Sequence, residues 1–173
     1  MSTTTPVVHV ERVLPERADL TVGEVDAILE AAFLATAADG RLSPEEYEAF
    51  RAVASTLRQI AAGKASGPRK IIPDKDLDAL FERFAVRSDH ATRSERLLTM
   101  NGKLGRTLVK ELAYKVAFAM ALCDLEANAD ESDYDDELVA AFGIEQDRAD
   151  TLAAEVYAAL DADLDRDSEA PPA

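Results

Sequence analysis

The sequence predicts an all-α protein, a compact bundle of six or seven helices. Alanine, leucine and charged residues that favour helices dominate the 173 residues, whereas glycine and proline number only seven each. Apolar residues recur at helical spacing along most of the chain, and no segment alternates as a strand would. A chain of this length usually folds as one domain. We expect a helical domain over residues 21–160, preceded by a flexible arm over 1–20 and followed by an acidic disordered tail over 161–173.

The first two helices are predicted from their start signals. Thr21 and Glu24 form the pattern of a capping box, in which each side chain binds the backbone N–H of the other residue. This helix is expected to end at Gly40, because glycine most easily adopts the left-handed conformation that terminates a helix. Ser43 to Glu46 then combines a capping serine, a first-turn proline and a second capping-box glutamate, so a new helix should start there.

Residues 63–73 contain two glycines and two prolines and are therefore expected to form a loop. Asp74 is predicted to cap the third helix. A short fourth helix should start at Thr92, with Glu95 as its capping-box partner.

Three further helices are expected in the last third of the chain. An apolar stripe over residues 108–123 predicts a long helix. The next helix should stop at Gly143, and the last one is centred on residues 152–160.

Charge is distributed unevenly along the chain. Residues 1–120 hold 17 acidic and 17 basic residues, whereas the last 53 residues hold 17 acidic and two basic ones and so account for the net charge of −15. Such an end repels nucleic acid and attracts cations or a protein partner with a basic surface, so we expect no nucleic-acid partner. The simpler explanation for these runs is a solvated helix face.

Several other classes of function are disfavoured. No apolar run approaches the roughly 20 residues that span a bilayer, and the first ten residues lack the pattern of a signal peptide, so we expect no membrane insertion. The single cysteine, Cys123, excludes an internal disulfide, suits a cytoplasmic protein and is expected to lie in the core. With only His9 and His90 besides, a structural zinc site is not expected.

No enzymatic activity is expected either, because no pair of carboxylates lies in obviously apolar surroundings that would raise a pKa for acid–base work. A basic run over residues 87–110 has no interleaved aromatic residues that could stack on bases. We interpret this run as solvated surface or, alternatively, as a docking surface for the acidic tail.

An internal repeat is the most informative feature. Two segments, here called the acidic corners, each follow an alanine-rich helix. In each corner an aspartate is followed four positions later by a capping residue, and the capping residue is followed three positions later by a glutamate. An amphipathic helix then begins. The two sets, 85 residues apart, are Asp39, Ser43 and Glu46, and Asp124, Asn128 and Glu131.

The two corners resemble the tellurite-resistance TerB family and its TerB-like superfamily, in which an alanine-rich helix, Ala-Asp-Gly, a short turn and an acidic helix start occur twice. The first copy, Ala38 to Glu46, fits well, whereas the second has Leu125 in place of the glycine. The resemblance covers about residues 21–160. It implies a compact helical bundle without enzymatic activity, a role in tellurite resistance or broader stress responses, and acidic residues proposed to bind metal.

The candidate metal ligands are Asp39, Glu46, Asp124 and Glu131. Carboxylates suit hard cations such as Ca²⁺ or Mg²⁺. Asp39 and Asp124 follow helix C-terminal ends, where the helix dipole disfavours a negative charge by about 0.3–1 kcal/mol, so a cation, a turn N–H or an arginine should compensate. The two glutamates are also explained as capping-box partners. The alternative function is a metal-independent protein-interaction module that uses the acidic C-terminal surface.

An EF-hand is a rival interpretation of the second corner. Oxygen-bearing side chains occupy the ligand positions of a twelve-residue calcium loop over residues 124–135, namely Asp124, Glu126, Asn128, Asp130, Ser132 and Asp135. However, Ala129 stands where such a loop needs glycine, and the last ligand is aspartate instead of glutamate. The sequence therefore favours the resemblance to the TerB family over an EF-hand.

Overall fold

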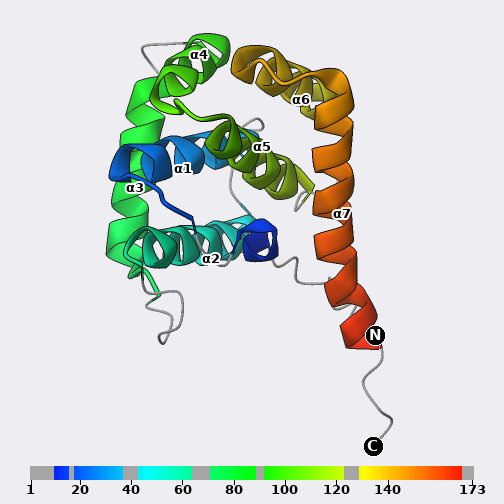
Figure 1. The fold of residues 1–173 in the computed structure, drawn as a ribbon. Helices are drawn as coiled ribbons and strands as arrows, with labels where there is room; N and C mark the ends of the chain where they lie inside the picture. The colour runs from blue at the N-terminus through cyan, green and yellow to red at the C-terminus, as the bar shows by residue number, and fades with distance from the viewer. Residues whose placement is uncertain are drawn as a thin grey trace, which may run out of the picture.

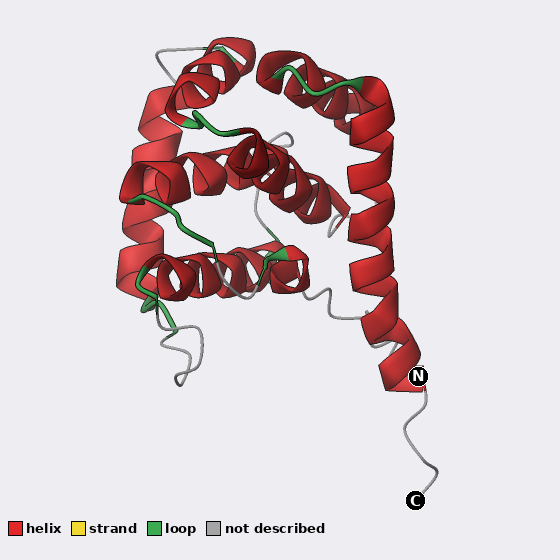
Figure 2. Cartoon of the chain, viewed as in Figure 1, coloured by secondary structure: helices red, strands yellow, loops and turns green. Residues whose placement is uncertain are grey.

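The structure, a computed structural model, describes residues 10–15, 18–36, 43–63, 71–88, 92–122 and 129–168; over 86–88, 129–133 and 161–168 only the backbone is described. These residues form one 3₁₀ turn and seven α-helices without any strand, which confirms the predicted all-α class (Figures 1 and 2). The elements are η1 (Val10–Val13), α1 (Val22–Thr36), α2 (Pro44–Ala61), α3 (Asp74–Ser88), α4 (Arg93–Lys103), α5 (Thr107–Leu122), α6 (Ala129–Phe142) and α7 (Gln146–Ser168).

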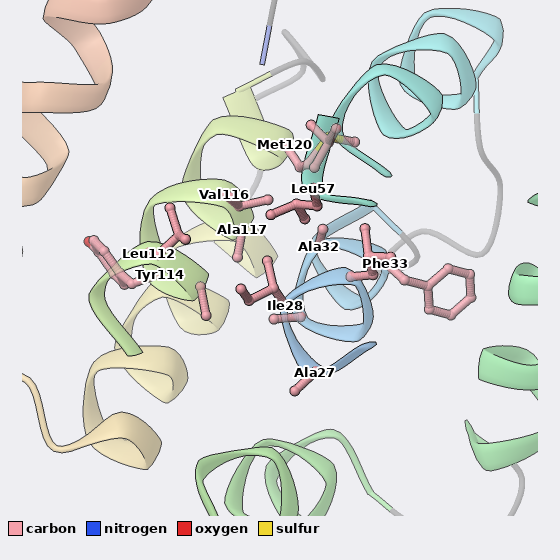
Figure 3. Close-up of a cluster of buried hydrophobic side chains, with 14 of the residues drawn as sticks. Ala27, Ile28, Ala32, Phe33, Leu57, Leu112, Tyr114, Val116, Ala117 and Met120 are labelled. Carbon is pink, nitrogen blue, oxygen red and sulfur yellow. The ribbon is translucent and has the colours of Figure 1, made fainter. Parts of the chain in front are cut away.

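Helices α1 and α5 form the centre of the bundle and pack directly on each other. They run in the same direction in Figure 3, from Ala27 toward Phe33 and from Leu112 toward Met120. Fully buried alanines from both helices let the two backbones approach closely. These alanines are Ala27, Ala31, Ala32, Ala113, Ala117 and Ala119. These alanines of α1 and α5 therefore belong to the core.

The other helices surround this pair. In Figure 1, α3 and α7 flank it on opposite sides, α2 covers one edge, and α4 and α6 cover the other. An aromatic cluster joins α1, α2 and α3, with Phe81 at its centre: its ring centroid lies 4.8 Å from that of Phe50 and 5.8 Å from that of Phe33. The core is thus continuous from α3 to α5.

The three predicted capping boxes are confirmed at the starts of α1, α2 and α4. In each box the hydroxyl accepts the N–H of the glutamate, and the carboxylate accepts the N–H of the capping residue, at distances of 2.8–3.2 Å. The pairs are Thr21 and Glu24, Ser43 and Glu46, and Thr92 and Glu95.

The predicted cap of the third helix is displaced by one residue. Helix α3 already includes Asp74, and the carbonyl of Pro73 accepts the N–H of Leu77 at 3.1 Å, so Pro73 holds the capping position. The carboxylate of Asp74 binds Arg51 of α2 instead. An ion pair across two helices has therefore replaced the expected cap.

The prediction of a flexible arm over residues 1–20 is wrong for the part of this segment that the structure describes. Turn η1 packs against α2, α5 and α7. Val10 has no exposed surface, and Val13 and Leu20 are also buried. The burial of these residues depends on tertiary contacts, because the apolar residues at positions 10 and 13 fill a gap between three helices. One turn is too short to produce a helical period in the sequence, so the sequence did not predict it.

The acidic tail predicted over residues 161–173 is also wrong in part, because α7 continues as a helix to Ser168. No glycine or proline interrupts residues 146–168, and alanine, leucine and arginine between the aspartates favour helix. Although α7 is 23 residues long, neither it nor any other helix in the described ranges is apolar enough to cross a membrane.

Candidate functional site

The helix boundaries reproduce the internal repeat. Val22 and Thr107, where α1 and α5 begin, are 85 residues apart, and so are Pro44 and Ala129, where α2 and α6 begin. The repeat in the sequence therefore corresponds to a duplicated unit of two helices joined by a corner.

The two units meet through α1 and α5 with their corresponding ends together. Arg106, which directly precedes α5, binds Glu24 in the first turn of α1, with Nη2 at 3.1 Å from both carboxylate oxygens. Since the two helices run in the same direction (Figure 3), α1 and α5 end on the same side of the central pair. The chain thus enters both corners from the same end of the central pair.

The structure describes the carboxylate of only one of the four predicted metal ligands. Asp39 and Asp124 lie outside the described residues, and Glu131 belongs to α6 but its side chain is not described. The buried Glu46 accepts the N–H of Ser43 at 2.8 Å as a capping-box partner. Within the described ranges, no three or more histidine, cysteine, aspartate or glutamate side chains form a group that could hold a metal ion.

The EF-hand interpretation of the second corner is wrong. Residues 129–135, which would form the second half of the calcium loop, are already helical in α6. The last expected ligand, Asp135, accepts a hydrogen bond from the Tyr114 hydroxyl at 2.7 Å. Burial raises the pKa of Asp135, and burial together with this carboxylate raises the pKa of Tyr114. Asp135 therefore links α6 to α5.

A groove of about 400 Å³ lies between residues 13–15 and 18–20 on one side and the N-terminal halves of α5 and α7 on the other. Its apolar lining includes Val13, Leu20, Val109 and Leu152, which are buried in the core, and Leu108, which is 79 % exposed. Cavities of this size, mostly apolar with a few polar groups, are typical of small-molecule sites. Sequence reasoning missed the groove because residues 13–20 were expected to belong to a flexible arm. Val10, Val13 and Leu20 gave no periodic signal, because η1 is a single turn of four residues.

Charged side chains of the groove form ion pairs across its walls. Nε of Arg148 donates to both oxygens of Glu111, at 3.1 and 2.9 Å, and Nη2 donates to one of them at 2.9 Å. This pairing raises the pKa of Arg148. Lys115 lies 2.6 Å from Glu155 and lowers the pKa of that carboxyl group. The two pairs tie α5 to α7 beside the apolar lining.

The basic run predicted to be solvated is in large part engaged within the protein. Arg96 is buried and binds Glu30, with Nη2 at 3.0 Å from Oε1. Arg93 binds Glu137 of α6, and its guanidinium lies 5.1 Å from the centroid of the Tyr134 ring. The interpretation as solvated surface is therefore wrong for these arginines. Arg93 does pair with the acidic end of the chain, through Glu137 of α6.

The Arg93–Glu137 pair makes stability depend on pH. Hydrogen bonds from Arg93 lower the pKa of Glu137 below its ordinary value of 4.5. A lowered pKa stabilises the fold above pH 4.5, and this stabilisation is lost as the pH falls through the folded-state pKa. Glu137→Gln should thus reduce the free energy of unfolding by about 1 kcal/mol at pH 7, and this difference should shrink below pH 4.5.

Urea unfolding at several pH values measures this effect. Glu82→Gln removes an exposed glutamate of α3 and should leave the free energy of unfolding nearly unchanged throughout. A Glu137→Gln difference that stays constant from pH 7 to pH 3 would contradict the assignment.

Comparison of the chain with models of protein families, with curated proteins and with solved structures finds no match. The resemblance to the TerB family thus rests on the two corner motifs, and the duplicated helix pair is a property read from this chain itself.

Proposed function

We propose that this protein is a TerB-like, non-enzymatic stress-response protein whose two acidic corners bind divalent cations. The observation that supports the proposal best is the duplication of the helix pair with an offset of 85 residues. Because α1 and α5 run side by side in one direction, the chain enters both corners at the same end of the bundle (Figure 3).

Electrostatics favours a cation there. Asp39 follows the end of α1 by three residues, and Asp124 follows the end of α5 by two. The C-terminal end of a helix carries a partial negative charge, which disfavours a nearby carboxylate. A cation with oxygen ligands, Ca²⁺ or Mg²⁺, compensates this charge and suits carboxylates.

Calorimetric titration of the chelator-treated protein with Ca²⁺ and with Mg²⁺ tests the proposal at moderate salt, which screens the exposed acidic residues. We expect saturable binding at one or two sites, and we expect Asp39→Asn combined with Asp124→Asn to abolish it. The matched control combines Asp76→Asn with Asp147→Asn, two exposed aspartates in the first turns of α3 and α7, and should bind like the wild type. Unchanged binding by the corner variant would refute the proposal.

The alternative function, a metal-independent interaction module, has one observation in its favour. Helix α7 extends beyond the rest of the bundle in Figure 1 and packs chiefly against α5 and η1. Tyr157 on this helix is about half exposed, although its ring stacks edge-on against Phe118. Weak heats that salt suppresses, without saturation, would favour this alternative and direct the search to a basic protein partner.

A further inference from the structure

We propose that the groove between residues 13–15 and 18–20, α5 and α7 binds a small amphipathic carboxylate, a molecule with an apolar chain or ring and one anionic head. This inference is independent of cation binding at the acidic corners, since no corner residue lines the groove. It rests on the size of the groove, its apolar lining and the state of its charged groups.

The apolar part of the ligand is defined by the lining. Residues from η1, α5 and α7 supply a continuous apolar surface that joins the core of the bundle. Leu108 remains 79 % exposed at the second position of α5, although it lines the groove. A ligand that covers Leu108 removes this apolar surface from water, which is the main source of affinity for such sites.

The charge of the head group follows from the hydrogen-bonding capacity that the charged side chains of the groove retain. Three cations, Arg106, Lys115 and Arg148, and two carboxylates, Asp19 and Glu111, line the groove. Each cation already pairs with a carboxylate: Arg106 with Glu24, Lys115 with Glu155 and Arg148 with Glu111. Both oxygens of Glu111 already accept from Arg148, so this carboxylate is poorly placed to receive a ligand ammonium group.

The arginines of the groove keep N–H donors beyond those used in their ion pairs. A guanidinium group has five N–H donors, and Arg148 uses only its Nε and Nη2 groups on Glu111. Arg148 remains 48 % exposed and Arg106 54 % exposed, so both can still reach a bound molecule. Glu111 holds the Arg148 fork in place, and a charge-assisted hydrogen bond to a ligand carboxylate then costs little further ordering.

The proposal is tested with three probes that share one ten-carbon chain: decanoate, decanol and decylamine. Each is titrated calorimetrically into the full-length protein without divalent cations and below its micelle concentration. We expect one decanoate per chain, bound about tenfold more tightly than decanol, the ratio that one charge-assisted hydrogen bond supplies, with decylamine weakest. Equal affinities for decanoate and decanol, or tighter binding of decylamine, would overturn the anionic head. Failure of all three to bind would overturn the site.

Two pairs of matched variants locate the binding. Leu108→Asp places a negative charge at the groove and should weaken decanoate binding at least tenfold, whereas Leu98→Asp, on the exposed face of α4, should not. Lys115→Gln should reduce the difference in affinity between decanoate and decanol. Lys103→Gln, at the exposed end of α4, should leave this difference unchanged. Equal effects within either pair would place the ligand elsewhere.

Discussion

Replacing Arg96 with methionine is expected to lower the free energy of unfolding by about 3–5 kcal/mol at neutral pH, because it leaves a buried carboxylate without its cation. Arg96 and Glu30 have side-chain exposures of only 4 % and 5 %. The guanidinium also donates from Nη2 to the carbonyl of Phe84 at 2.9 Å, so one side chain connects α4 with α1 and α3. Urea unfolding monitored by circular dichroism measures the loss.

Two further variants isolate the pair. Lys103→Met changes an exposed cation on the same helix and should alter the free energy of unfolding by less than about 0.5 kcal/mol. The double variant Glu30→Met with Arg96→Met should regain most of the lost stability, since two apolar side chains replace two buried charges. If the double variant is no more stable than Arg96→Met alone, the loss of stability does not come from breaking the Arg96–Glu30 ion pair.

The second large effect is expected at the N-terminus. Val10→Asp should lower the free energy of unfolding by at least about 3 kcal/mol, because it removes a fully buried valine and places a carboxyl group among apolar side chains. Thermal and urea unfolding both report this change. A flexible arm would instead predict almost no effect.

The same substitution elsewhere provides the control. Val22 is 86 % exposed at the first position of α1, where an aspartate suits the helix dipole, so Val22→Asp should leave stability unchanged or slightly raised. Equal stabilities for the Val10 and Val22 variants would contradict the packing of η1 against α2, α5 and α7.

The features that sequence predicts well here are local. A hydroxyl and a glutamate three residues apart identify the starts of α1, α2 and α4, because both partners of each hydrogen bond lie within one turn. The duplicated helix pair was visible for the same reason, since each copy carries its own start signal. The helical class follows from these signals and the near absence of breakers.

The features that sequence misses depend on distant partners. Arg96 belongs to a run of basic residues, and only the approach of α1, 66 residues earlier, makes it buried. The burial of Val10 likewise depends on helices that follow much later in the chain. At the candidate metal site, the spacing of the acidic residues does not distinguish a metal ligand from a helix cap. Glu46 fits the pattern of a ligand, yet its carboxylate caps α2.

The packing of η1 against α7 has a consequence for how the protein is made. The first described element and the last are neighbours, so the bundle stays open until α7 has left the ribosome. At typical rates of synthesis, roughly 10–30 s pass between the appearance of Val10 and the completion of its pocket. Throughout that interval the valines of η1 lack their contacts with α7, and this side of the bundle is completed only when η1 and α7 meet.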